Sequence, residues 1–218
     1  MAGTPDYGYT GGGLLFWDRE TRQSTLLGHT ELLPEHSTQS LAPLPGGRLM
    51  GGSTTSPGTG GEKKASEAEL YILDMATKRV QWHAAVFPGA QTYTDLHLGP
   101  DGLVFGFVDR ALFFVFDPAA RAIVHREVTA ERRGPTISHQ GPRVFVADPD
   151  SPDTIYVLFE KGIARLDSRS YAMTLIAQSP VSIQAGGDVL DGRLYFAHGS
   201  ELWSCAVPAG RGAGRRTG

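Results

Sequence analysis

Short apolar runs alternate with polar turns along the whole chain, and four of the runs end in an aspartate. Three residues after each aspartate stands a small or hydroxyl-bearing residue, then a long, usually cationic one, and then a second β-type run. This order suits a hairpin turn, because an aspartate can accept a hydrogen bond from the backbone two residues further on. Each unit therefore predicts a strand, a short turn and a second strand. The four aspartates are Asp18, Asp74, Asp117 and Asp167.

A second turn-and-strand element precedes the first one in each repeat. Asp-Gly pairs at 101–102 and 191–192, and a Gly-Gly pair at 46–47, are strong hairpin signals, and an apolar run follows each of them. Together the two elements make a four-stranded antiparallel meander. The intervals between the aspartates bracket the roughly 40–50 residues of one propeller blade. No apolar period of 3.6 residues extends beyond about a dozen residues, so the pattern predicts an all-β fold, a β-propeller.

Three complete blades are predicted, at residues 40–84, 94–127 and 142–177, with an incomplete blade on either side. We name the strands of a blade a to d, from the innermost to the outermost. The first incomplete blade has strands c and d, with a remnant of b, and the last has strands a, b and c. Their strands are expected at Leu14–Asp18, Gln23–Leu27 and Tyr7–Tyr9, and at Asp188–Leu190, Leu194–His198 and Leu202–Val207.

The blades predict a partial propeller over residues 1–208. Either the chain is part of a longer one, which we favour, or the two incomplete blades merge and close a small ring, since closure removes exposed strand edges. Residues 209–218 form a Gly/Arg-rich tail that offers nothing to bury and is expected to be disordered.

The segment LYILDMATKRVQW, residues 70–82, resembles the repeat of quinoprotein-like and lactonase-like β-propellers, a group that includes YVTN-like repeats. In these repeats an apolar strand, an aspartate, a Thr-containing turn and a later tryptophan recur. The resemblance covers about residues 12–206 and implies the propeller fold.

Composition narrows the function classes. The net charge of −3 provides no positive field for nucleic acid or for an anionic membrane. The lone cysteine, Cys205, forms no internal disulfide. The first residues lack the basic and apolar regions of a signal peptide, and no stretch approaches the roughly 18 apolar residues that span a bilayer. We expect a soluble, cytoplasmic protein, with secretion left open if the N-terminus is truncated.

The candidate site lies where the d-to-a and b-to-c connections emerge, because strand alternation places both at the same end of the blades. These connections are polar, and each connection between blades carries a glutamine. Side chains that converge there on a central channel would suit a sugar or a carboxylate-bearing small molecule. The alternative is that they only satisfy backbone groups where blades pack. The candidate binding residues are His36, Gln39, Gln91, Thr94, Asp95, His139, Gln140 and Gln184.

The longest connection, residues 51–69, belongs to the same end and is expected to be a disordered insert or a mobile lid. It is not a phosphate-binding loop, because the segment 60–63 lacks the Gly-Lys-Ser/Thr ending.

Two functions remain open. The first is a binding scaffold that presents a polar central face to a small polar ligand, such as a carbohydrate, or to a protein partner. The second is a metal-assisted lyase or hydrolase acting on a carbohydrate or a lactone, suggested by the resemblance and by His36, His97 and His139. No pair of histidines has the short spacing of a zinc motif, so the sequence assigns no metal ligand, cofactor or catalytic residue.

Overall fold

The computed structural model describes residues 2–3, 5–137, 143–149 and 151–208. Within these ranges the chain forms five antiparallel sheets, each built from consecutive strands. One short helix, α1 (Ala130–Arg133), lies between the third and fourth sheets along the chain. In the described part of the chain, no helix is long and apolar enough to cross a membrane.

Three sheets have four strands and two have three. The four-stranded sheets are β4 (Ser37–Leu44), β5 (Arg48–Thr54), β6 (Leu70–Asp74) and β7 (Arg79–Ala84); β8 (Tyr93–Leu98), β9 (Val104–Val108), β10 (Leu112–Asp117) and β11 (Ala122–Val128); and β12 (Phe145–Asp148), β13 (Ser151–Phe159), β14 (Gly162–Asp167) and β15 (Met173–Gln178). The three-stranded sheets are β1 (Ala2–Gly3), β2 (Gly13–Trp17) and β3 (Ser24–Gly28), and β16 (Ala185–Leu190), β17 (Arg193–His198) and β18 (Glu201–Ala206).

The predicted all-β class, with three complete blades and two incomplete ones, is confirmed. One strand was placed wrongly. The b strand of the first blade is β1, which pairs Ala2 with Leu14 of β2, and not Tyr7–Tyr9. The segment with the two tyrosines instead bonds to the long loop, where the Gly8 N–H donates to the Thr59 carbonyl at 2.8 Å. The predicted tail 209–218 lies outside the described residues.

The aspartate-ended hairpins form the turn that the sequence predicts. In each one, a carboxylate oxygen accepts a hydrogen bond from the backbone N–H three residues on, at 2.8 Å for Asp18, 2.7 Å for Asp74, 3.1 Å for Asp117 and 2.8 Å for Asp167. The next residue adopts a left-handed conformation. The four aspartates thus have like environments, as a repeat requires. The left-handed residues are Arg22, Lys78, Arg121 and Tyr171, with φ of 57°, 60°, 56° and 60°.

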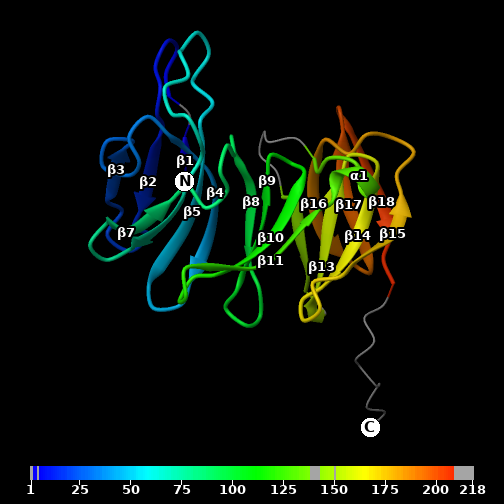
Figure 1. Ribbon diagram of the computed structural model, residues 1–218. Coiled ribbons are helices and arrows are strands. Elements are labelled where there is room, and N and C mark those ends of the chain that lie inside the picture. The colour runs from blue at the N-terminus through cyan, green and yellow to red at the C-terminus, as the bar shows by residue number, and fades with distance from the viewer. Residues whose placement is uncertain (1, 4, 138–142, 150, 209–218) are drawn as a thin grey trace.

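The sheets follow one another in chain order, with β1–β3 at one end and β16–β18 at the other (Figure 1). The inner strands β4, β8, β12 and β16 lie side by side in that order. Aromatic side chains fill the spaces between neighbouring sheets; the ring of Phe107 lies 5.5 Å from that of Phe145 on the next sheet. Since the first and last sheets lie at opposite ends, the blades form an open arc, and the small closed ring is not formed.

Candidate functional site

The candidate residues that the structure describes lie at the end of the blades where the d-to-a and b-to-c connections emerge, which we call the loop face. In Figure 1 this is the end at which the loop after β5 and the helix α1 lie. Gln91 and Gln184 stand in connections between blades, and His36 directly precedes β4. His139 and Gln140 lie outside the described residues.

Gln91 binds together three segments of the loop face. Its backbone N–H donates to the carboxylate of Asp109, at 3.0 Å, in the turn between β9 and β10. Its side-chain oxygen accepts hydrogen bonds from the Thr55 hydroxyl, at 2.9 Å, and from the Lys63 ammonium group. Its amide nitrogen donates to the Ser66 carbonyl at 3.2 Å. The long loop is therefore fixed to the connection between the second and third blades.

The long loop, expected as a disordered insert or a mobile lid, is also bonded to the blades at several other points. His36 accounts for one of them: its Nε2 lies 2.9 Å from the Glu67 carbonyl and its Nδ1 lies 2.7 Å from the Pro34 carbonyl. The Glu67 carboxylate accepts a hydrogen bond from the Gly89 N–H at 2.8 Å. Both ring nitrogens of His36 lie within hydrogen-bonding distance of carbonyl oxygens, so this side chain stabilises the loop.

Thr94 and Arg110 connect the third blade to the fourth. The Thr94 hydroxyl accepts a hydrogen bond from the Arg110 backbone N–H at 2.9 Å. The Arg110 guanidinium donates to the Thr136 carbonyl at 3.0 and 2.8 Å and forms an ion pair with Glu160, in the turn after β13. Sequence reasoning missed Asp109, Arg110 and Glu160. Asp109 and Arg110 could have been identified from the sequence, because they form a charged pair between two apolar strands. A turn this short presents its side chains on the loop face.

Asp95 reaches from one inner strand to the next. Its carboxylate accepts hydrogen bonds from the backbone N–H groups of Val144, at 2.8 Å, and Phe145, at 3.2 Å. Burial raises the pKa of Asp95 to about 6, although these hydrogen bonds act in the opposite direction. The Ser40 hydroxyl makes the corresponding bond one blade earlier, to the Tyr93 carbonyl at 2.8 Å.

The remaining described candidates also belong to the blades' own structure. The side-chain oxygen of Gln184 accepts a hydrogen bond from the Gly199 N–H at 2.7 Å. Gln39 lies at the β-bulge of β4. His97 lies against Phe145, with ring centroids 5.8 Å apart, and burial lowers its pKa. Among the described residues, no group of three or more His, Cys, Asp or Glu side chains is placed to hold a metal ion.

Comparison with known proteins identifies the architecture. No protein-family model and no curated protein matches the chain. Solved structures that are similar to it include the Dos1 propeller (TM-score 0.60, 15% identity over 91% of this chain), the β-propeller domain of Myceliophteria thermophila Cps50 (Swd1) (TM-score 0.58, 10% identity over 92%) and BamB from Moraxella catarrhalis (TM-score 0.58, 15% identity over 97%). The fold is a β-propeller.

At these identities the likeness shows the fold alone. The chain covers 46% of the Dos1 structure, 58% of BamB and 67% of Swd1, so it spans about half to two thirds of the propellers that it resembles. Propellers host both binding and catalysis, so function has to be argued from the loop face itself.

Proposed function

We propose that the chain is a binding scaffold whose loop face holds a protein partner. The observation that supports this proposal is the fixed position of the long loop, residues 55–69, which stands above the blades (Figure 1) and is bonded to Gln91, His36 and Gly89. A preordered loop loses little conformational entropy when a partner binds, which favours affinity. A raised surface suits a protein better than it suits a small ligand, which needs a hollow.

Exposed charges on several connections support the same proposal. Lys64 lies in the long loop, Arg132 in α1 and Lys161 in the turn between β13 and β14, and all three are exposed. They come from three different blades or connections, so a partner that spans the loop face would meet all of them. Charged groups at the rim of an interface mainly steer association and set specificity.

The test starts with recovery of partners from an extract of the source cells on the immobilised chain. Each recovered protein is then purified, and its affinity for the chain is measured by calorimetry. Lys64→Glu, Arg132→Glu and Lys161→Glu together should weaken the complex by about tenfold or more, because each reverses a charge on the loop face. Arg169→Glu is the matched control, since this exposed arginine lies in the turn between β14 and β15, at the opposite end of the blades.

Two outcomes would contradict the proposal. One is a purified partner whose affinity falls with Arg169→Glu and not with the triple substitution. The other is saturable binding of a small sugar or sugar acid at the loop face, measured by calorimetry, without any protein partner; that result would favour the small-ligand form of the scaffold.

A further inference from the structure

The second and third blades share a pocket of about 340 Å³ between their turns, at the end of the blades opposite the loop face. We call it the turn pocket. It is lined by the turns between β4 and β5, between β8 and β9 and between β10 and β11, which lie at the lower end of the blades in Figure 1. Both blades have all four strands, and their inner strands β4 and β8 lie side by side. The walls of the pocket therefore come from two complete blades.

The walls of the turn pocket are apolar and fixed in place. Leu44, at the end of β4, is 6% exposed and packs in the same apolar cluster as Phe116 of β10. Pro118 is buried, and its ring is rigid. The β8–β9 turn is held by its own backbone, since the Gly99 N–H donates to the Leu103 carbonyl at 2.8 Å. A preformed hollow with apolar walls is the usual form of a small-molecule site, and 340 Å³ is near the lower end of the usual size range.

Three charged side chains line the turn pocket and form no ion pair with one another. They are Arg48, Asp101 and Asp117. The Arg48 Nε donates to the Pro45 carbonyl at 3.2 Å, and the other two guanidinium nitrogens make no hydrogen bond to the described part of the chain. Nor does the Asp101 carboxylate accept a hydrogen bond from these residues. A cation and two carboxylates thus stand around one hollow, and the space between them is open.

The third blade departs from the repeat at this pocket. In the second and fourth blades, the hydroxyl groups of Thr77 and Ser170 donate to the turn aspartate, at 2.8 and 2.9 Å. The third blade has Ala120 at this position, so the Asp117 carboxylate accepts only backbone hydrogen bonds from the described chain, both of them at Oδ1. Its Oδ2 therefore keeps its acceptor sites for a donor in the pocket.

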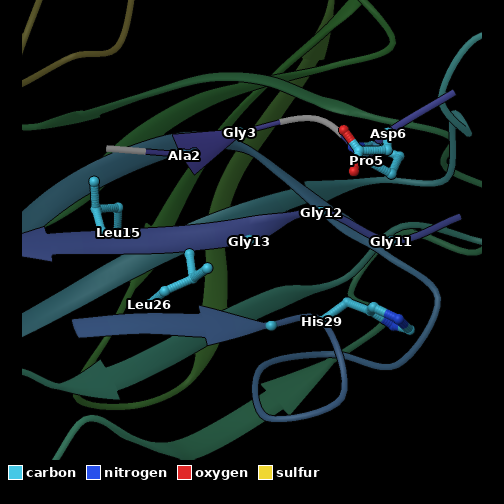
Figure 2. Close-up of a pocket in the computed structure, with 11 residues that line it drawn as sticks. Ala2, Gly3, Pro5, Asp6, Gly11, Gly12, Gly13, Leu15, Leu26 and His29 are labelled. Carbon is cyan, nitrogen blue, oxygen red and sulfur yellow. The ribbon is translucent and has the colours of Figure 1, made fainter. Parts of the chain in front are cut away.

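A larger hollow on the first sheet, of about 460 Å³, has a different lining. Leu15 and Leu26 lie at one end of it and His29 at the other (Figure 2). Asp6 contributes a carboxylate, but none of the described residues that line this hollow is a lysine or an arginine. Unlike the turn pocket, it offers a ligand no permanently charged cation.

We propose that the turn pocket binds a free α-amino acid with an apolar side chain, a ligand additional to the partner of the loop face. The Arg48 guanidinium donates to the ligand carboxylate, and Asp101 and Asp117 accept from its ammonium group. Its side chain lies against Leu44 and Pro118. A ligand with a carboxylate alone would bring its charge near two unmatched aspartates, and an amine alone would leave Arg48 without a partner. The charges of the pocket therefore select a zwitterion.

The experiment measures binding to the full chain by calorimetry, with L-leucine, L-valine and L-methionine as probes. At least one of them should bind saturably, with one molecule per chain. Isocaproate is leucine without its amino group, and isoamylamine is leucine without its carboxyl group. Each should bind at least about tenfold more weakly than L-leucine, because each lacks one of the charged contacts.

Substitutions locate the ligand. Arg48→Gln and Asp101→Asn, tested separately, should each weaken binding of the amino acid at least about tenfold. Asp191→Asn is the matched control, since Asp191 precedes a glycine in the β16–β17 turn as Asp101 does in the β8–β9 turn, but lies away from the pocket. It should bind as the parent chain does. All three substitutions lie at turns, so each variant should keep the far-ultraviolet circular dichroism of the parent, which is recorded alongside.

Three results would overturn the proposal. The first is the absence of saturable binding for all three amino acids up to about 10 mM. The second is binding that survives both Arg48→Gln and Asp101→Asn, since the ligand would then lie elsewhere, for instance in the hollow of the first sheet. The third is an affinity for isocaproate or isoamylamine equal to that for L-leucine, because the pocket would then not read both charges.

Discussion

The carboxylate of Asp95 accepts a hydrogen bond from the backbone N–H of Val144 at 2.8 Å and thereby joins β8 to the residue just before β12. The strand β8 has a bulge between Tyr93 and Asp95, and β4 has one between Thr38 and Ser40. Asp95 and Ser40 each stand at the end of such a bulge, and each binds the backbone of the next inner strand. The bulges thus aim polar side chains at the neighbouring blade and fix the spacing of the blades around the arc.

The buried Asp95 carboxyl should make stability depend on pH. Its pKa in the folded chain is about 6, above the usual value near 3.8, because burial disfavours its ionised form. Its contribution to stability is fully present below the unfolded pKa and is lost as the pH rises through about 6. Between about pH 4 and pH 7 the free energy of unfolding should fall by up to about 3 kcal/mol relative to that of Asp95→Asn. Urea denaturation at several pH values measures both curves.

The control for this prediction is Asp101→Asn, a substitution in an exposed turn. Its curve should follow that of the parent chain. Parallel pH curves for the parent and Asp95→Asn would show that Asp95 does not titrate in this range.

A glycine that lies under an aromatic ring should not tolerate a methyl group. Gly106 pairs with Phe114 across β9 and β10, and a Cβ on Gly106 would lie 2.2 Å from an atom of the Phe114 ring. That ring is fully buried and lies 5.2 Å from the ring of Phe87, so it has little room to move. Gly106→Ala should lower the free energy of unfolding by about 1–3 kcal/mol, as overpacking does. Gly3→Ala, where a Cβ meets nothing within 4 Å, is the control, and equal losses from both substitutions would contradict the prediction.

The blade repeat could be predicted from the sequence because its turn chemistry is local. An aspartate and a residue three positions later make the hairpin, and both can be read from a short segment. The bulges could not be predicted. Leu26 and Trp82 lie equally far after Asp18 and Asp74, so the sequence aligns them. In the structure Leu26 pairs with Leu15. The register shift in the second blade leaves Trp82 opposite Ile72, one position nearer to its turn aspartate. One extra residue in a strand leaves no mark in the apolar pattern.

The candidate site was predicted in part. The polar connections were expected at one end of the blades, and the described candidates lie there. Their partners could not be predicted, because a glutamine such as Gln91 binds segments that are distant in sequence, from Thr55 to Asp109. The Arg110–Glu160 pair joins two turns that lie fifty residues apart, and only the packing of the blades brings them together.

The left-handed residue of each aspartate turn offers a stabilising substitution. Arg121 has φ of 56°, which costs a residue with a side chain roughly 1–2 kcal/mol and costs glycine little. Arg121→Gly should therefore raise the free energy of unfolding by about 0.5–1 kcal/mol. Ala120→Gly in the same turn is the control and should lower it, because glycine gains freedom in the unfolded chain without relief of strain. Thermal unfolding of both variants measures the difference, and a lower melting temperature for Arg121→Gly would contradict the argument.

Removal of the Gln91 side chain should release the long loop while the blades stay folded. Its amide group bonds to Thr55, Lys63 and Ser66, so Gln91→Ala removes a side-chain bond from each half of the loop. Trypsin should then cut after Lys63 or Lys64 about five to tenfold faster. Proteolysis follows the population of the open loop. Loss of about 1 kcal/mol of hydrogen-bond stabilisation in the closed loop raises that population by this factor. Gln81→Ala, in the outer strand β7, is the control and should leave the cleavage rate unchanged. Equal rates for Gln91→Ala and the parent chain would show that the remaining bonds, among them those of Glu67, His36 and Gly8, hold the loop without the Gln91 side chain.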